Sequence, residues 1–141
     1  MTGMRRRARE CALQILYQLD VGGHLGADPD VRPEMERYWD SFDPVSPEAR
    51  AFAERLVTGV AERVEELDRV LNDASSNWKL GRMAKVDRNL LRLAAYEILH
   101  CADIPRSASI NEAIEIGKRF SSGDSASFVN GILDRLGKDG S

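Results

Sequence analysis

The sequence lacks the features that mark several classes of protein. It has only two cysteines, Cys11 and Cys101, and neither is part of a CxxC spacing, which argues against a secreted disulfide scaffold and against a zinc site. No stretch approaches the roughly 20 apolar residues that cross a bilayer. The basic start followed by apolar residues superficially resembles a signal peptide, but Glu10, Gln14 and Gln18 interrupt the apolar part at helical intervals. We therefore expect a cytoplasmic protein.

Catalytic signatures are also missing. The sequence contains no glycine-rich phosphate loop, no HExxH, no GxSxG and no Rossmann fingerprint. The two histidines, His24 and His100, are isolated, and His100 fits the C-terminal end of a helix, where a cation is mildly favoured. Glu112 and Glu115 fit a helix cap and a solvated helix face. These absences predict a protein that is not an enzyme and that needs neither a metal nor a cofactor.

Helical periodicity dominates the chain, and the alternation typical of strands is absent. A length of 141 residues fits one domain, residues 1–141, and the shares of hydrophobic (43%) and charged (30%) residues are those of a globular protein. We expect a compact all-α helical bundle. The expected helices cover residues 8–19, about 34–41, 47 to about 72, 86 to about 101, 109–120 and about 125–136.

Several helix starts carry capping signals. Ser46 before Pro47 fits an N-cap followed by proline in the first turn. The run from Ser109 to Glu112 fits a capping box, and Asp124 fits an N-cap of the last helix. Residues 24–45 are acidic and loop-like, with Pro29, Pro33 and Pro44.

Charge is distributed unevenly along the chain. The net charge is −3, yet the first ten residues carry +3, from Arg5, Arg6, Arg7 and Arg9 against Glu10. The remainder has 16 basic and 22 acidic side chains, a net of −6. An acidic protein with a short basic arm is expected to bind a polyanion at one localised site.

On a helical wheel, Arg6, Arg9, Leu13 and Tyr17 fall together beside the apolar stripe, while Arg5 and Arg7 would project from a frayed first turn. Guanidinium groups bind phosphates and stack on bases, and a tyrosine adds a stacking platform. Single-stranded RNA fits that combination, because its bases are free to stack.

A solvated, arginine-rich turn explains the same residues about equally well when the arm is considered alone. However, four cations at the positive end of a helix dipole are locally unfavourable. That cost favours a functional reason for the arm.

Several segments of the chain resemble the bacterial transcription antitermination factor family NusB. The resemblance rests on RRRARECALQILYQLD, VDRNLLRLAAYEIL, DIP, INEAIEIGKRF and DSASFVNGILD, in this order. It covers nearly the whole chain except Gly22 to Val45. It implies two three-helix subbundles, in agreement with the bundle expected from periodicity.

The resemblance also implies a function. Members of the family bind the single-stranded boxA element of nascent RNA, notably of ribosomal RNA operons, as a heterodimer with NusE, a ribosomal small-subunit protein. With other Nus factors, that complex helps RNA polymerase read through terminators. Carried over by motif, the RNA-binding residues would be Arg5, Arg6, Arg7, Arg9 and Phe128. The residues facing the partner would be Tyr17, Asp87 and Asp124.

Two alternatives stay open. A similar domain begins certain ribosomal RNA cytosine methyltransferases, which would require a downstream Rossmann domain with a nucleophilic cysteine that these 141 residues do not contain. A helical scaffold that binds only protein is the other alternative. The sequence also leaves open whether the free chain forms a homodimer.

Overall fold

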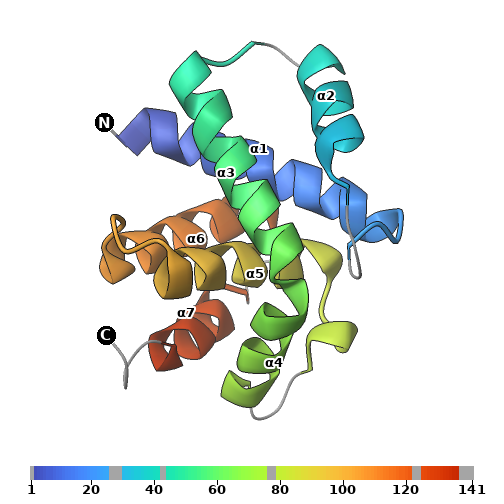
Figure 1. The fold of residues 1–141 in the computed structure, drawn as a ribbon. Helices are drawn as coiled ribbons and strands as arrows, with labels where there is room; N and C mark the ends of the chain where they lie inside the picture. Colours follow the sequence, from blue (N-terminus) through green and yellow to red (C-terminus); the bar gives the residue numbers. More distant parts are fainter. Residues whose placement is uncertain (1, 26–29, 42–43, 76–78, 122–124, 137–141) are drawn as a thin grey trace. The chain divides into compact units, whose positions relative to one another are not determined.

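The regular secondary structure in the described part of the chain is entirely helical. The computed structural model describes residues 2–25, 30–41, 44–75, 79–121 and 125–136, and these form seven α-helices and one 3₁₀ turn, with no strand among them (Figure 1). The expected all-α fold class is confirmed. Within these residues, no helix is long and apolar enough to span a membrane. The chain divides into two compact units, Met1–Val64 and Glu65–Ser141.

The first unit is built from three helices. Helix α1 (Thr2–Val21) packs against α3 (Pro47–Glu62) and, over a smaller area, against α2 (Arg32–Ser41). The apolar stripe expected on α1 is buried, including Leu16, which is fully inaccessible to solvent. The N-cap of α3 is also confirmed, because the Ser46 hydroxyl accepts a hydrogen bond from the Ala49 amide (3.1 Å).

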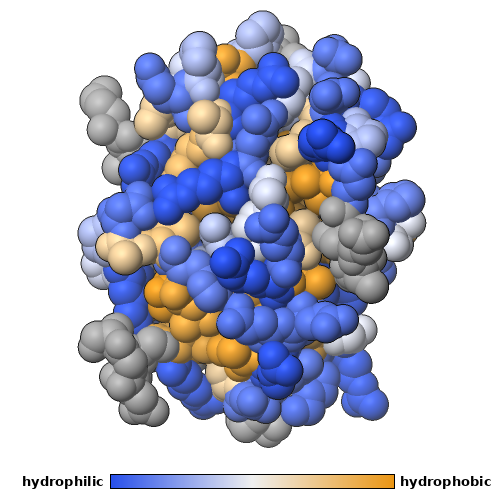
Figure 2. Space-filling view, in the orientation of Figure 1, coloured by the Kyte–Doolittle hydropathy of each residue, from blue (hydrophilic) through white to orange (hydrophobic). Residues whose placement is uncertain are grey.

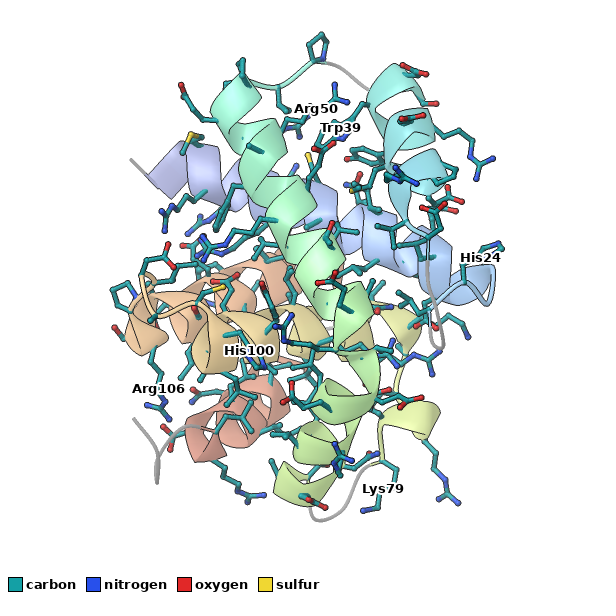
Figure 3. All side chains as sticks on the ribbon, in the orientation of Figure 1. His24, Trp39, Arg50, Lys79, His100 and Arg106 are labelled. Atoms are coloured by element: carbon teal, nitrogen blue, oxygen red, sulfur yellow. The ribbon has the colours of Figure 1, made fainter. Side chains whose placement is uncertain are left out.

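Helix α2 is held to its neighbours by polar contacts of aromatic side chains. The Tyr38 hydroxyl donates to Gln14 Oε1 of α1 (2.7 Å), and Trp39 Nε1 donates to Glu54 Oε2 of α3 (2.9 Å). The Arg50 guanidinium lies over the Trp39 ring, 5.3 Å from its centroid, and bonds the same Glu54 oxygen (Figure 3). The short helix expected at about residues 34–41 is therefore present.

One expected helix is in fact two. The buried side chains recur at helical spacing from Phe52 to Leu71, but α3 ends at Glu62 and α4 (Val64–Ala74) follows. Arg63 separates them with φ −124° and ψ 20°, and its amide donates to the Val60 carbonyl (3.1 Å). No glycine or proline marks this break, so the continuous apolar period concealed it.

The second unit contains four helices and the 3₁₀ turn. After α4 come η1 (Leu80–Arg82), α5 (Lys85–His100), α6 (Arg106–Phe120) and α7 (Ser125–Arg135). Helices α5, α6 and α7 pack on one another, and α5 buries residues around most of its circumference, as expected of a central helix.

An ion pair and a hydrogen bond tie α4 to the central helix α5. Arg92 of α5, 7% exposed, binds both carboxylate oxygens of Asp68 of α4, with its Nε 2.7 Å from Oδ1 and its Nη2 2.8 Å from Oδ2. His100, the last residue of α5, places Nε2 2.7 Å from Glu66 Oε1. These contacts orient the first turn of α4 towards the C-terminal half of α5.

The expected capping box does not form. Helix α6 begins at Arg106, with Pro105 as its N-cap, so Ser109 lies inside the helix and is buried. Its hydroxyl donates to Glu97 Oε1 of α5 (2.8 Å), and Glu97 is only 1% exposed. A buried carboxylate needs hydrogen-bond donors, and the Ser109 hydroxyl is one of them. Ser109 therefore bonds to α5 and does not cap α6.

Candidate nucleic-acid interface

The arginine arm is part of a regular helix. Helix α1 begins at Thr2, so the first turn is ordered where fraying was expected. Arg7 is exposed, Arg5 and Arg6 are half-buried, and Arg9 is only 4% exposed. The first turn of α1 contains no acidic residue. Three of the four arginines can therefore reach solvent from a rigid scaffold, while the fourth is covered by protein.

A phenylalanine of α3 lies beneath two of these arginines. The guanidinium carbon of Arg5 is 4.8 Å from the centre of the Phe52 ring, and that of Arg9 is 5.5 Å from it. Arg5 and Arg9 are one helical turn apart, so their side chains leave α1 on the same side. A cation over an aromatic face is attracted by the electron density of the ring. Phe52 thereby restricts the positions of both guanidinium groups.

Phe52 is not among the site residues expected from the sequence. It is 8% exposed and belongs to the core, and its ring also serves as the platform for the arm. No sequence signal connects a residue of α3 with an arginine more than forty positions earlier. The contact depends on how α1 packs against α3 within the first unit.

The helical face expected to bind RNA is not continuous. Arg9 and Leu13 are buried, at 4% and 2% exposure, whereas Tyr17 is 36% exposed. The wheel grouped these residues correctly by angle, but α3 covers part of that face. Tyr17 therefore lies on the accessible part of α1, separated from Arg5 to Arg7 by about three turns.

Asp87 has a partner within its own unit. It lies in the first turn of α5, is 8% exposed, and accepts a hydrogen bond from the Ser121 hydroxyl at the end of α6. This bond joins the start of α5 to the end of α6. Asp87 thus lies near the start of the helix expected from residue 86, whereas its role in partner binding stays a prediction.

Two of the expected site residues cannot be placed. Asp124 lies outside the described residues. The backbone of Phe128 belongs to α7, but its side chain lies outside the described part of the structure. Their roles in binding the partner and RNA stay predictions.

Buried polar groups near the arm are structural. Burial, and a hydrogen bond that the phenol shares with the neighbouring Cys11 sulfur as its acceptor, raise the pKa of the Tyr38 phenol well above its usual value. Both cysteines are free thiols and are buried. Among the described residues, no group of three or more His, Cys, Asp or Glu side chains could hold a metal ion.

The surface near these elements is largely polar. Figure 2 shows hydrophilic residues over most of the face drawn, with smaller hydrophobic areas between them. Among the described residues, the large hydrophobic side chains that remain exposed are Met4, Tyr17, Val21 and Leu99, and three of these four belong to α1. Helix α1 thus carries both exposed cations and exposed apolar side chains.

An all-helical chain with cations at the start of its first helix has close counterparts among known proteins. The profile of the NusB family matches residues 6–138. The transcription antitermination protein NusB of Anaeromyxobacter dehalogenans is 49% identical over 136 residues, with 96% of this chain and 92% of that protein covered. The protein of the same name from Geobacter sulfurreducens is 46% identical over 134 residues, with 95% and 94% covered. The chain therefore belongs to the NusB family of transcription antitermination proteins.

Solved structures agree with this assignment. Thermotoga maritima NusB superposes with a TM-score of 0.81 at 38% identity, and the match covers 96% of this chain and 91% of that one. A complex of the antitermination factors NusB and NusE with double-stranded RNA contains a chain that superposes with a TM-score of 0.82. Its identity is 23%, so that likeness shows the fold alone.

Proposed function

We propose that this chain is a transcription antitermination factor that binds the boxA element of nascent RNA together with NusE, without catalysing a reaction. The observation that carries the proposal is the ordered arginine arm of α1, in which Arg5, Arg6 and Arg7 extend from a helix braced by Phe52. The relatives named as antitermination proteins and the NusB–NusE–RNA complex of the same fold support it.

The contacts divide by residue. Arg5, Arg6 and Arg7 bind phosphates, because their guanidinium groups are positively charged and none of the three side chains is fully buried. Arg9 acts mainly by holding the arm in place through its buried contact with Phe52. Phe128 would add a stacking surface for a base.

The partner surface is assigned to Tyr17, Asp87 and Asp124. Tyr17 is the accessible member, and a partly exposed tyrosine is a common anchor of protein interfaces. Bound together, the chain and NusE would act in the cytoplasm on RNA polymerase within a larger complex of Nus factors. The relatives that this chain covers almost completely are named as antitermination proteins, which favours an antitermination factor over a methyltransferase.

The test compares RNA binding by the wild type and by the triple variant Arg5→Ala/Arg6→Ala/Arg7→Ala. Each lost phosphate contact on single-stranded RNA should lower the slope of log K against log salt by about 0.7, so the triple variant should lose about 2. The control is Arg32→Ala/Arg37→Ala/Lys118→Ala, which removes the same charge from exposed residues paired with Asp30, Glu34 and Glu115. A slope unchanged in the arm variant would overturn the assignment.

The same titrations with NusE present test the partnership. Because the remainder of the chain is acidic, binding of RNA by the chain alone should be weak, and NusE should strengthen it through a coupling of about 1–3 kcal/mol. A chain that binds NusE but does not bind RNA, whether NusE is present or absent, would instead be a scaffold that binds only protein.

A further inference from the structure

A second cluster of cations lies between α4 and α5, in the second unit. Residues 79–88 contain four basic side chains and one acidic side chain: Lys79, Arg82, Lys85, Arg88 and Asp87. Asp87 is buried and accepts a hydrogen bond from Ser121, so the exposed charged side chains of this segment, Lys79, Arg82 and Lys85, are all basic. In a chain of net charge −3, this ten-residue segment carries as much positive charge as the arginine arm.

The 3₁₀ turn η1 directs these side chains outward. In a 3₁₀ helix, residues three apart project on the same side. Leu80 and Met83 are three apart and are buried, at 3% and 5% exposure, while Lys79 and Arg82, also three apart, are exposed. Lys85, three residues further on, is exposed at the first position of α5.

The turn is held in a defined conformation. The Leu80 amide donates to Asn72 Oδ1 of α4 (3.0 Å), and the Arg82 amide donates to the Lys79 carbonyl (2.9 Å). With Leu80 and Met83 anchored in the core, the backbone that carries the cations is already ordered. Less conformational entropy is then lost when a ligand binds.

The cations themselves are available. Among the described residues, Arg82 and Lys85 form no ion pair, and Lys79 makes only a long hydrogen bond to the Asn72 carbonyl (3.5 Å), as its outward side chain in Figure 3 suggests. Lys85 also lies at the positive end of the α5 dipole, where a cation is locally unfavourable. Local stability therefore does not account for these side chains.

We propose that Lys79, Arg82 and Lys85 form a second basic surface that binds the phosphate backbone of RNA. Protein interfaces usually include an aromatic or apolar anchor, and none of the exposed large hydrophobic side chains among the described residues lies in this segment. Phosphate binding needs only cations, and contacts of this kind position RNA without reading its bases. The charge, and the lack of such an anchor within the described residues 79–88, together favour RNA over an acidic protein.

The inference rests on the proposed function only in requiring that the chain binds RNA. The experiment measures binding of two single-stranded RNAs of equal length, one with boxA and one scrambled, by fluorescence anisotropy over a range of salt concentrations. It compares the wild type, Lys79→Ala/Arg82→Ala/Lys85→Ala, the arm variant and the charge-matched control Arg32→Ala/Arg37→Ala/Lys118→Ala. Each protein is measured alone and with NusE.

The second basic surface should contribute equally to both RNAs. The alanine variant should lose about 0.7 of salt slope per contact, or about 2 for three contacts, which corresponds to about a hundredfold loss of affinity at 0.1 M salt relative to 1 M. The swapped variant Lys79→Arg/Arg82→Lys/Lys85→Arg should retain the wild-type slope, because either cation can neutralise a phosphate. Melting curves should show that the wild type, the alanine variant and the swapped variant are equally folded.

Each other outcome identifies a different failure. A normal slope in the alanine variant, with a lowered slope in the arm variant, would overturn this inference and leave the proposed function intact. A lowered slope in the alanine variant, with a normal slope in the arm variant, would support the second basic surface and overturn the assignment of the arm. An equal loss in the charge-matched control would show an effect of net charge alone and overturn the inference. A loss of NusE affinity without loss of RNA affinity would assign the surface to a protein partner instead.

Discussion

Replacing Arg9 with alanine should destabilise the protein, although its neighbour Arg7 can be replaced with little effect. Arg9 is 4% exposed, and its guanidinium lies 5.5 Å from the centre of the Phe52 ring. The substitution removes two buried methylenes, each worth about 0.8 kcal/mol. It also removes a desolvated cation–π contact worth about 2 kcal/mol.

Relief of the desolvated charge acts in the opposite direction, because burying a cation is costly. The net loss in the free energy of unfolding should therefore be about 2–3 kcal/mol for Arg9→Ala. Arg9→Met keeps the apolar stem and should lose about half as much. Arg7→Ala, on an exposed side chain, should stay within about 0.5 kcal/mol of the wild type.

Urea denaturation followed by circular dichroism measures these differences. A double-mutant cycle with Phe52→Leu, which preserves most of the apolar volume, isolates the contact between ring and cation and should give a coupling of about 1–2 kcal/mol. If Arg9→Ala costs no more than Arg7→Ala, Arg9 is not buried in solution. A coupling below about 0.3 kcal/mol would mean that the ring does not hold the guanidinium.

Two further predictions concern buried polar groups. Because the pKa of Tyr38 is raised in the folded state, the unfolded phenol ionises first, and stability should fall as the pH rises above about 10. Tyr38→Phe should remove that part of the decline, and an identical alkaline profile in both proteins would contradict the prediction. Asp87→Ala should cost about 1–3 kcal/mol by leaving the Ser121 hydroxyl without its acceptor, whereas Asp87→Asn keeps an acceptor oxygen. A lowered NusE affinity in Asp87→Asn, with an unchanged melting temperature, would place the carboxylate at the partner surface, and no change would remove it from there.

Much of the helical architecture could be predicted from local patterns. The α1 stripe, the Ser46 cap and the central helix α5 follow from apolar spacing and capping chemistry, which act over a few residues. The break at Arg63 could not be predicted, because the buried residues on both sides keep one continuous helical period. The position of Ser109 was also mispredicted, since the pattern of a capping box does not reveal that a buried Glu97 needs its hydroxyl.

The candidate site was predictable in composition and not in geometry. Counting charge identified the arm, because four arginines in ten residues contrast with an acidic remainder. Counting could not distinguish Arg9 from Arg7, since the difference arises from α3, which packs over one side of α1. The same packing supplies Phe52 as a platform, and its role depends on a contact between residues far apart in sequence.

Burial also changes the expected salt dependence of RNA binding. With Arg9 covered, the arm offers three phosphate contacts, which on single-stranded RNA account for a slope of about −2. Three further contacts at Lys79, Arg82 and Lys85 would extend the wild-type slope to about −4. The arm alone would therefore account for a measured slope near −2, and no phosphate contacts would remain for the second basic surface. A slope near −4 that drops by half in either triple variant requires both surfaces to contact RNA in the same complex.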